Sequence, residues 1–284
     1  MTNLAPRTAR FGWSAVPRLA TLLSTASWLS LAGCSLDPQF IGREREGSSP
    51  PDDGFGGSLP LLPSDDPGSK PGCAPRLEGV VRDFKAFGTE GGHPDFEQFE
   101  GEGMAGIVED ELGPDRKPVY AYDGPTPYTT GREHFDQWFR DVPGVNHAIR
   151  HVIPLDVSDQ VFRIFHSDEF FPIDGRGWGN QDRDHNYGFT FELHMMFEYR
   201  GGDDFMFGGD DDIWVFINNR LAIDIGGVHG SAFMVVDLDE MAEEYGLELG
   251  ERYPLDIFFA ERRSGGSSLL ISTLKYTNCD PILL

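Results

Sequence analysis

Residues 208–230 read GGDDDIWVFINNRLAIDIGGVHG, and this stretch decides the fold. The apolar run of residues 213–217 and a second strand-like run, residues 221–225, flank the pair Asn218-Asn219. Asn tolerates positive φ better than most residues, so this pair suits the tight primed turn that joins two antiparallel strands. The stretch therefore predicts a β-hairpin.

Other parts of the chain repeat the strand pattern. From residue 189 to 199, apolar and polar side chains alternate with a period of two, which is typical of a strand with one buried face. Further strands are expected near residues 161–165, 253–260 and 268–274. We therefore expect residues 73–284 to form a single, mostly β domain, an antiparallel β-sandwich or barrel.

One helix is expected after the hairpin, with a second helical turn elsewhere. Asp237 is a good N-cap, Glu240 follows three residues later, and Gly246 supplies the stop signal. Phe135, Trp138 and Phe139 have helical spacing and indicate the additional turn.

The N-terminus has the features of an export signal. Three arginines precede an apolar run at residues 19–31, which is too short for a membrane span. The run ends in Leu31-Ala32-Gly33-Cys34, which resembles the lipobox of bacterial lipoproteins. We expect residues 1–33 to be removed and Cys34 to carry a lipid. The resemblance implies a cell-envelope location, with Ser35 favouring the outer membrane; an ordinary secretory peptide is the alternative.

Residues 34–72 are expected to form a disordered linker, because they are rich in Pro, Gly, Ser and Asp and offer little apolar surface to bury. Cys73 and Cys279 then remain as an even pair, which in an exported protein predicts a disulfide. Two free thiols are the alternative.

The net charge of −24 excludes a nucleic-acid partner, because phosphate binding needs clustered Lys and Arg. The same charge opposes contact with an anionic membrane surface, so we expect membrane contact through the N-terminal lipid alone. It favours solubility and affinity for divalent cations.

The domain resembles a known family, the fibro-slime domains of exported bacterial and slime-mould proteins. These are related to the β-sandwich first named from anthrax protective antigen. The matching pieces, in order, are Gly79-Val80-Val81-Arg82-Asp83-Phe84, His93-Pro94-Asp95-Phe96-Glu97, Phe135 with Gln137-Trp138-Phe139, Phe170-Phe171-Pro172-Ile173-Asp174-Gly175, His185-Asn186 leading into Phe189-Thr190-Phe191-Glu192, the acidic hairpin, and Ala260-Glu261-Arg262. One departure is the hairpin turn, Asn218-Asn219 where the family usually has Asn-Gly.

The resemblance implies a protective-antigen-type sandwich and work in extracellular matrix, cell adhesion or carbohydrate binding. In yeast adhesins of the related lectin branch, two consecutive aspartates hold a calcium ion that coordinates sugar hydroxyls. Aligned on the hairpin strand, that pair falls on Asp210 and Asp211. Asp212 then falls on a position that those lectins leave uncharged.

The residues themselves also favour a cation site at the hairpin entrance. Like charges as close as Asp210, Asp211 and Asp212 repel one another, and a bound cation relieves the repulsion. Ca²⁺ prefers six to eight oxygen ligands, so we add Asn218 to the expected ligands, with Asp203, Asp204 and backbone carbonyls available nearby in sequence. The alternative is a solvated acidic turn that deters edge-to-edge pairing.

A second polar loop, residues 174–185, is a further candidate binding surface. It offers oxygens for a cation or for hydroxyls and an indole that can stack on a sugar ring. The expected ligand-binding residues are Asp174, Trp178, Asn180, Asp182, Asp184, His185 and, from the hairpin, His229. The alternative is a long surface turn whose Trp178 packs on its neighbours. His166, His185 and His229 lack the close spacing of a zinc site.

Catalysis is not expected, because the chain has no Gly-x-Ser-x-Gly motif and no catalytic cysteine setting. Glu192, Glu198 and Glu261 lie on predicted strands, where a glycosidase acid and base would have to pair by coincidence. The preferred hypothesis is calcium-dependent adhesion to carbohydrate or matrix. The alternatives are a structural or protein-interaction module that calcium only stabilises and, more remotely, a polysaccharide-active enzyme.

Overall fold

A computed structural model describes residues 76–155, 162–202 and 204–274. By its internal contacts the chain divides into residues 1–57 and 58–284, and all of the described residues belong to the second unit. The predicted signal peptide, the lipidation site Cys34, the linker, and the predicted disulfide partners Cys73 and Cys279 lie outside the described residues. Across the described ranges, no helix is both long enough and apolar enough to cross a membrane.

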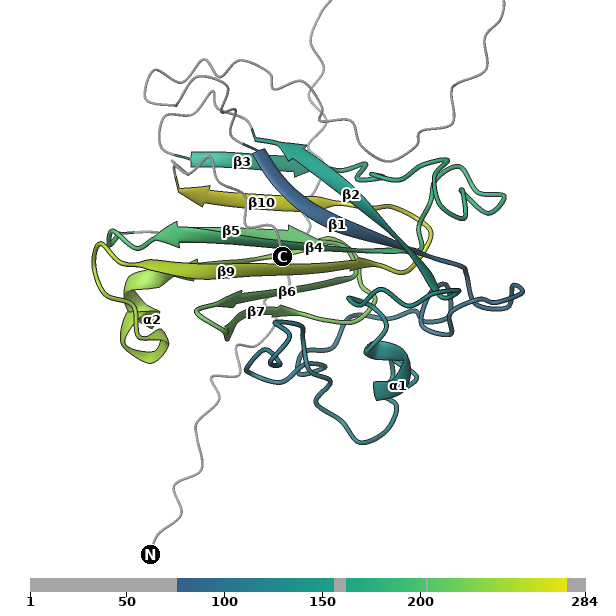
Figure 1. Cartoon of the computed structure of the whole chain (residues 1–284), viewed down its shortest axis with the longest axis horizontal. Coiled ribbons are helices and arrows are strands. Elements are labelled where there is room, and N and C mark those ends of the chain that lie inside the picture. The colour runs from purple at the N-terminus through teal and green to yellow at the C-terminus, as the bar shows by residue number, and fades with distance from the viewer. Residues whose placement is uncertain (1–75, 156–161, 203, 275–284) are drawn as a thin grey trace, which may run out of the picture. The chain divides into compact units, whose positions relative to one another are not determined.

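The described residues form two antiparallel sheets (Figure 1). The first sheet has six strands in the spatial order β2 (Asn146–Pro154), β1 (Arg76–Phe84), β4 (Phe189–Glu198), β9 (Arg252–Glu261), β6 (Asp212–Ile217) and β7 (Arg220–Ile225). The second has four strands in the order β3 (Phe162–Ser167), β10 (Leu269–Leu274), β5 (Asp204–Gly209) and β8 (Ala232–Asp237). The predicted β-sandwich is confirmed.

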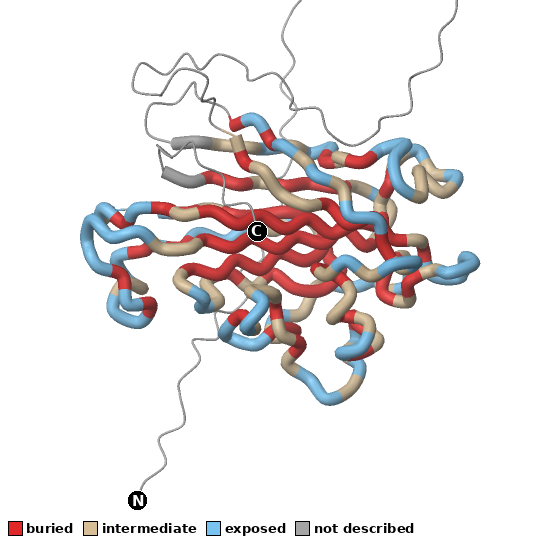
Figure 2. Tube along the Cα trace, in the orientation of Figure 1, coloured by how far each residue is buried: buried red, intermediate tan, exposed pale blue. Residues whose placement is uncertain are grey.

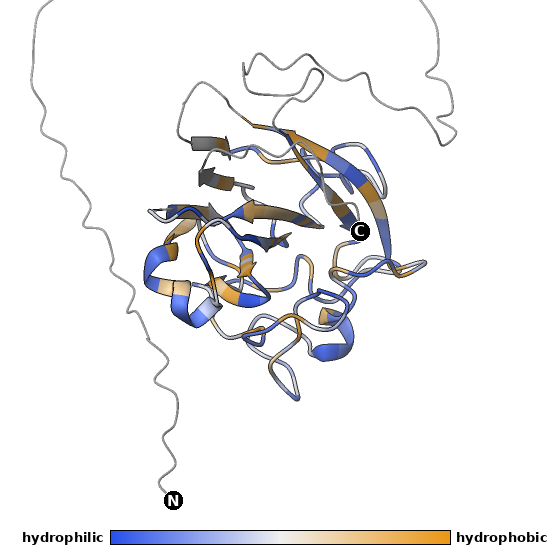
Figure 3. Ribbon diagram, turned by 60° about the vertical axis from the view of Figure 1, so that its left-hand side comes forward, coloured by the Kyte–Doolittle hydropathy of each residue, from blue (hydrophilic) through white to orange (hydrophobic). Residues whose placement is uncertain are grey.

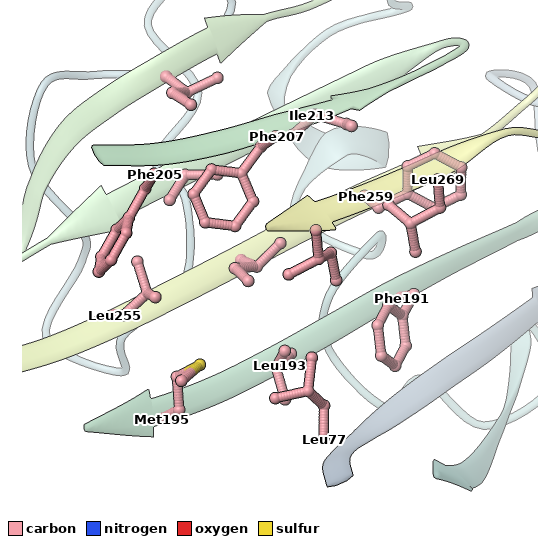
Figure 4. Packing of buried hydrophobic residues seen from close by; sticks show 14 of the residues in the cluster. Leu77, Phe191, Leu193, Met195, Phe205, Phe207, Ile213, Leu255, Phe259 and Leu269 are labelled. Carbon is pink, nitrogen blue, oxygen red and sulfur yellow. The ribbon is translucent and has the colours of Figure 1, made fainter. Parts of the chain in front are cut away.

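The main core lies between the two sheets. Phe191, Leu193 and Met195 of β4 point inward together with Leu255 and Phe259 of β9 (Figure 4). From the facing sheet, Phe205 and Phe207 of β5 and Leu269 of β10 pack against them. The buried stretches follow the central strands (Figure 2), and hydrophilic and hydrophobic residues alternate along the strands (Figure 3). The period of two in the sequence therefore marks the core-facing side of the strands.

A second apolar cluster covers the outer face of the six-stranded sheet. Trp214 and Phe216 of β6 and Phe258 of β9 contribute the sheet side of this cluster. The opposite side comes from residues 85–145, a largely irregular segment that contains the short helix α1 (Arg132–Phe135) and includes Tyr120 and Trp138. In Figure 1, α1 and its loops lie on the side of β6 and β7. We call residues 85–145 the covering layer. Because it buries the outer face of β6, every residue of that strand is buried.

The local signals for the turn and the helix are also confirmed. Asn218 and Asn219 both have positive φ, 48° and 69°, as a primed hairpin turn requires. Helix α2 (Leu238–Tyr245) begins after Asp237, whose side chain accepts hydrogen bonds from the N–H groups of Asp239 and Glu240. It ends at Gly246, whose φ of 65° is in the left-handed region that favours glycine.

Candidate functional site

The candidate site lies at one end of the six-stranded sheet, where β6 begins and β9 ends. The register pairs Asp212 with Ala260 across these two strands and Phe189, at the start of β4, with Glu261. Antiparallel pairing thus brings three distant parts of the sequence to the same end. The acidic corner consists of Asp210, Asp211, Asp212 and Glu261.

Asp212 is a partner in a fully buried ion pair. Its Oδ2 lies 2.7 Å from Nε of Arg262, and both side chains have an exposed fraction of 0%. Its Oδ1 accepts a hydrogen bond of 2.5 Å from the backbone N–H of Gly227. Because both carboxylate oxygens are already engaged, the geometry argues against Asp212 as a metal ligand.

Arg262 connects this corner to the covering layer. Its Nη1 donates to the backbone carbonyls of Tyr128, at 2.7 Å, and Asp95, at 3.3 Å. Its guanidinium lies 4.5 Å from the ring centroid of Trp138, close enough for a cation–π contact. The Asp95 carboxylate accepts from the Trp138 indole N–H at 3.1 Å, so the three residues form one buried polar group.

Asp211 and Glu261 are buried carboxylates with incomplete hydrogen bonding. Asp211 has an unusual positive φ of 60°, and its Oδ2 accepts a 2.7 Å hydrogen bond from the N–H of Arg262. Burial raises the pKa of Asp211 to about 7, against the lowering effect of Arg262. Burial, and then the charges of Asp211 and Asp210, raise the pKa of Glu261 well above its ordinary value. Oε2 of Glu261 and Oγ of Ser267 are both buried without a well-aligned hydrogen bond, and the nearby Ser267 hydroxyl lowers the Glu261 pKa only in part.

Asp210 completes the corner at its solvent side. It is half-buried, and its Oδ1 accepts a hydrogen bond from the N–H of Ser268. From the described residues, no hydrogen bond reaches the second oxygens of Asp210 and Asp211. Asp210, Asp211 and Glu261 thus each have a carboxylate oxygen without a well-aligned hydrogen bond from the described residues. These oxygens can share protons or hold a cation.

The described residues do not form a converged metal site. Within residues 76–155, 162–202 and 204–274, no group of three or more His, Cys, Asp or Glu side chains is arranged to hold a metal ion. Burial and the neighbouring carboxylates raise the pKa values of Asp211 and Glu261, but the side chains do not converge on a point. A cation would have to draw them together.

The prediction that Asn218 is a ligand of the same ion is wrong. Asn218 follows Ile217, the last residue of β6, whereas the aspartates precede Ile213. At about 3.3 Å per strand residue, β6 separates the two ends by roughly 20 Å. The Asn218 side chain instead donates a 2.7 Å hydrogen bond to the carbonyl of Tyr245. Asp204 also lies away from the acidic corner, because it pairs with Asp237 at the opposite end of β5 from Gly209. Asp203 lies outside the described residues.

The loop of residues 174–185 is held by internal contacts. Asp174 Oδ2 lies 2.6 Å from Nδ1 of His185. Asn180 Oδ1 accepts from the N–H of Gly175 at 2.7 Å, and its Nδ2 donates to the carbonyl of Asp184 at 2.9 Å. Asp182 and Asp184 are exposed. These oxygens belong to a folded loop and do not surround a common point.

Trp178 packs on its neighbours, as the alternative interpretation of this loop expects. Its ring centroid lies 4.3 Å from Nζ of Lys85 and 4.1 Å from the ring centroid of His147. Its backbone N–H donates to the Asp83 carboxylate.

The three histidines considered above have separate surroundings. Nδ1 of His229 lies 2.6 Å from the carbonyl of Gly230, and its Nε2 is buried without a partner. His166, on β3, pairs with Asp168 at 3.2 Å, and His185 pairs with Asp174. Among the described residues, nothing joins these imidazoles into one site.

Glu261 and Arg262 are the members of the site that sequence reasoning did not assign. Their sequence signal was the run Ala260-Glu261-Arg262, which ends a predicted strand in charged residues that the structure buries. The pairing of β6 with β9 was needed to place that run beside the aspartates.

Comparison with known proteins finds similarity to several proteins of Dictyostelium discoideum. Protein psiD is 40% identical over 191 residues, which cover 61% of this chain and 37% of psiD. Protein psiC is 35% identical over 189 residues, covering 61% of this chain and 36% of psiC. The chain thus spans less than two fifths of the length of these relatives. No protein-family model matches the chain, and the fibro-slime resemblance stays a prediction.

Solved structures give only distant likenesses. A PA14 sugar-binding domain from an RTX adhesin matches with a TM-score of 0.25 and 14% identity over 70% of this chain and 90% of that domain. A β-glucosidase from Kluyveromyces marxianus matches with a TM-score of 0.27 and 11% identity over 71% of this chain and 17% of the enzyme. These scores are too low to support an argument about function.

We predict that Asp212→Ala lowers the free energy of unfolding by about 3–5 kcal/mol, because it leaves the buried Arg262 guanidinium uncompensated. Urea denaturation measures this change. Asp123→Ala, at an exposed aspartate, is the control, with an expected change within about 0.5 kcal/mol. Equal effects of the two substitutions would contradict the assignment of Asp212 to a structural ion pair.

We also predict that Asp211→Asn stabilises the metal-free protein at pH 8 and that this gain shrinks as the pH falls. The raised pKa of Asp211 means that the folded state binds the proton more tightly, so ionisation above pH 7 costs stability. The gain at pH 8 is on the order of a few kcal/mol. It disappears toward the ordinary pKa of an aspartate, about 4.

Urea denaturation of both proteins in EDTA, from pH 8 to pH 5, measures the difference. His93, whose pKa burial lowers to about 4, destabilises both proteins below about pH 6.5. The difference between them therefore reports on Asp211 together with Glu261, whose pKa the charge of Asp211 raises. A difference that grows as the pH falls would contradict the prediction.

Proposed function

We propose that residues 73–284 form a non-catalytic binding module in which the acidic corner takes up Ca²⁺ and presents it to carbohydrate or matrix polysaccharide. One observation carries the proposal. Oε2 of Glu261 is buried without a well-aligned hydrogen bond, and burial, followed by the charges of Asp211 and Asp210, raises the Glu261 pKa well above its ordinary value. An unsatisfied buried carboxylate oxygen is costly, and a bound cation removes that cost.

Calcium suits the corner better than a transition metal does. The available ligands are carboxylate oxygens from Asp210, Asp211 and Glu261, with backbone carbonyls beside them, and Ca²⁺ prefers oxygens in flexible arrangements of six to eight. Side chains must converge for the ion to bind, so we expect uptake of calcium to order the loops around the corner.

Sugar hydroxyls are suitable ligands for the remaining positions. Asp210 is half-buried and therefore leaves the ion accessible from solvent. Residues 262–268 and 226–231 form the loops beside the corner and contain exposed Gly230, Ser231 and Gly265. Small side chains at these positions leave room for a sugar ring close to the ion.

We predict that calcium at pH 8 raises the melting temperature of the protein and that EDTA reverses the rise. A hundredfold excess of calcium over its Kd corresponds to about 2.7 kcal/mol of added stability. The double substitution Asp210→Asn with Asp211→Asn and the single substitution Glu261→Gln should each abolish or strongly reduce the rise. Asp123→Asn is the matched control and should behave as the wild type.

A glycan array screened with calcium and with EDTA then tests carbohydrate binding. The proposal expects binding that requires calcium and disappears in the double variant. Calcium stabilisation without any glycan binder would favour the structural or protein-interaction module instead. Release of reducing ends from matrix polysaccharide would favour the enzyme.

We further propose that the module is held at the cell envelope, with the outer membrane as the expected location, by a lipid on Cys34. The lipobox-like run that ends at Cys34 supports this assignment. Metabolic labelling with palmitate should label the wild type and should not label Cys34→Ala. Equal labelling of both proteins would contradict the anchor.

A further inference from the structure

Strand β8 is an edge strand with exposed apolar side chains. It is the last strand of the four-stranded sheet, and of the described strands only β5 pairs with it. Phe233, Met234 and Val235 in its centre have exposed fractions of 66%, 39% and 55%. Among the turns and loops that the structure describes, none has a backbone hydrogen bond to residues 232–236. The outer edge of β8 therefore offers both backbone groups and apolar side chains to a partner.

Two of the other sheet edges are protected in ways that β8 lacks. The covering layer lies along the edge of β7, where the N–H of Leu221 donates a 2.8 Å hydrogen bond to the carbonyl of Asp110. Strand β2 carries the exposed Arg150 and ends in Pro154. Charged side chains and prolines at an edge discourage the addition of a further strand, and residues 232–236 contain neither. Strand β8 is thus open to strand addition.

The side chains along β8 point alternately to the two faces of its sheet. Met234 lies opposite Phe207 of β5, which belongs to the main core. Phe233 and Val235 occupy the alternate positions and therefore point away from the core. A strand added beside β8 would place its own alternate side chains next to these two, as cross-strand neighbours.

Acidic residues flank the apolar centre of β8 at both ends. Ala232, at the start of the strand, pairs with Gly209, which directly precedes Asp210 of the acidic corner. At the other end Asp237 lies opposite Asp204, and both residues are exposed. Like charges directly opposite each other are unfavourable in an antiparallel pair. A basic side chain beside this end would relieve the repulsion.

This distribution of charge fits a basic partner better than a second copy of the chain. A two-fold axis would pair the two β8 strands antiparallel, which brings the Asp210 end of one strand beside the Asp204 and Asp237 end of the other. Like charges brought together in this way oppose association, and the net charge of −24 adds to the repulsion. An extended segment with an apolar centre and basic ends complements both the strand and its flanks.

We propose that β8 binds an extended segment of another protein, which adds to the four-stranded sheet as a further strand. The segment has alternating apolar residues beside Phe233 and Val235 and lysine or arginine at both ends, beside Asp204 and Asp210. Backbone hydrogen bonds hold such a segment, and the side chains select its sequence. Strand β8 contains none of the proposed calcium ligands, so this inference does not rest on the proposed function.

The test measures the binding of labelled synthetic peptides of about ten residues, the length of a long strand, to the full chain in EDTA. One peptide alternates valine and threonine between terminal lysines. A second has glutamates in place of the lysines, and a third keeps the lysines but has a proline at its centre. Fluorescence anisotropy should give a Kd at least about tenfold lower for the lysine peptide than for either of the others, because glutamates meet the flanking acids and proline removes a hydrogen bond between the strands.

Variants assign the binding to β8. Val235→Asn should weaken binding of the lysine peptide about tenfold, because it removes an apolar side chain that the peptide covers. Val152→Asn, the same change at an exposed position of edge strand β2, should stay within about twofold of the wild type. Asp204→Asn should weaken binding about threefold, and Asp123→Asn should leave it unchanged. Melting temperatures of all four variants should match the wild type.

Hydrogen exchange then tests the mode of binding. With the lysine peptide at saturation, backbone amides within residues 232–236 should exchange at least about fivefold more slowly, because the added strand accepts hydrogen bonds from them. Unchanged exchange in β8, equal binding of the three peptides, or equal effects of Val235→Asn and Val152→Asn would each overturn the proposal. A dimer in analytical ultracentrifugation that Val235→Asn dissociates would assign this edge to a second copy and would overturn it as well.

Discussion

The buried ion pair between Arg262 and Asp212 is the interaction on which the candidate site depends. Removing two charges from water costs several kcal/mol per ion, and geometry this close with added hydrogen bonds is needed to offset that cost. Arg262 obtains those bonds from Asp212 and from backbone carbonyls of the covering layer. The pair therefore fixes the end of β9, the start of β6 and the covering layer relative to one another.

The same pair explains why the carboxylates of the acidic corner differ in their partners. Asp212 is neutralised by Arg262, whereas burial and neighbouring carboxylates raise the pKa values of Asp211 and Glu261. With Asp210, this places four carboxylates beside one fully buried guanidinium. Protons on Asp211 and Glu261 relieve the repulsion in the corner at lower pH, and a divalent cation can take the place of those protons as the pH rises.

Further ion pairs hold the covering layer along the outer face of the sheet. Nζ of Lys117 lies 2.6 Å from Glu192 on β4, and Arg116 pairs with Asp256 on β9, which also lies 2.5 Å from Nδ1 of His194. Charged groups and the aromatic cluster therefore act together. This layer carries Asp95, Glu97 and Tyr128 to the functional end, so the site depends on residues far from it in sequence.

Local sequence signals were sufficient for the hairpin, the turn at Asn218 and the caps of α2, because each depends on neighbouring residues. The covering layer could not be predicted, since residues 85–145 lack a regular hydrophobic period. Asn218 was misplaced because closeness in sequence was taken as closeness in space, although a full strand intervenes. The role of Glu261 depended on the β6–β9 register, which the sequence alone does not reveal.

Anomalous diffraction from crystals grown in millimolar calcium would most directly test whether Asp210, Asp211 and Glu261, rather than Asp212, hold a cation. The account predicts a peak bounded by Asp210, Asp211 and Glu261, with Asp212 still paired to Arg262. An ion coordinated by Asp212 with Arg262 displaced, or no peak at the corner, would contradict it.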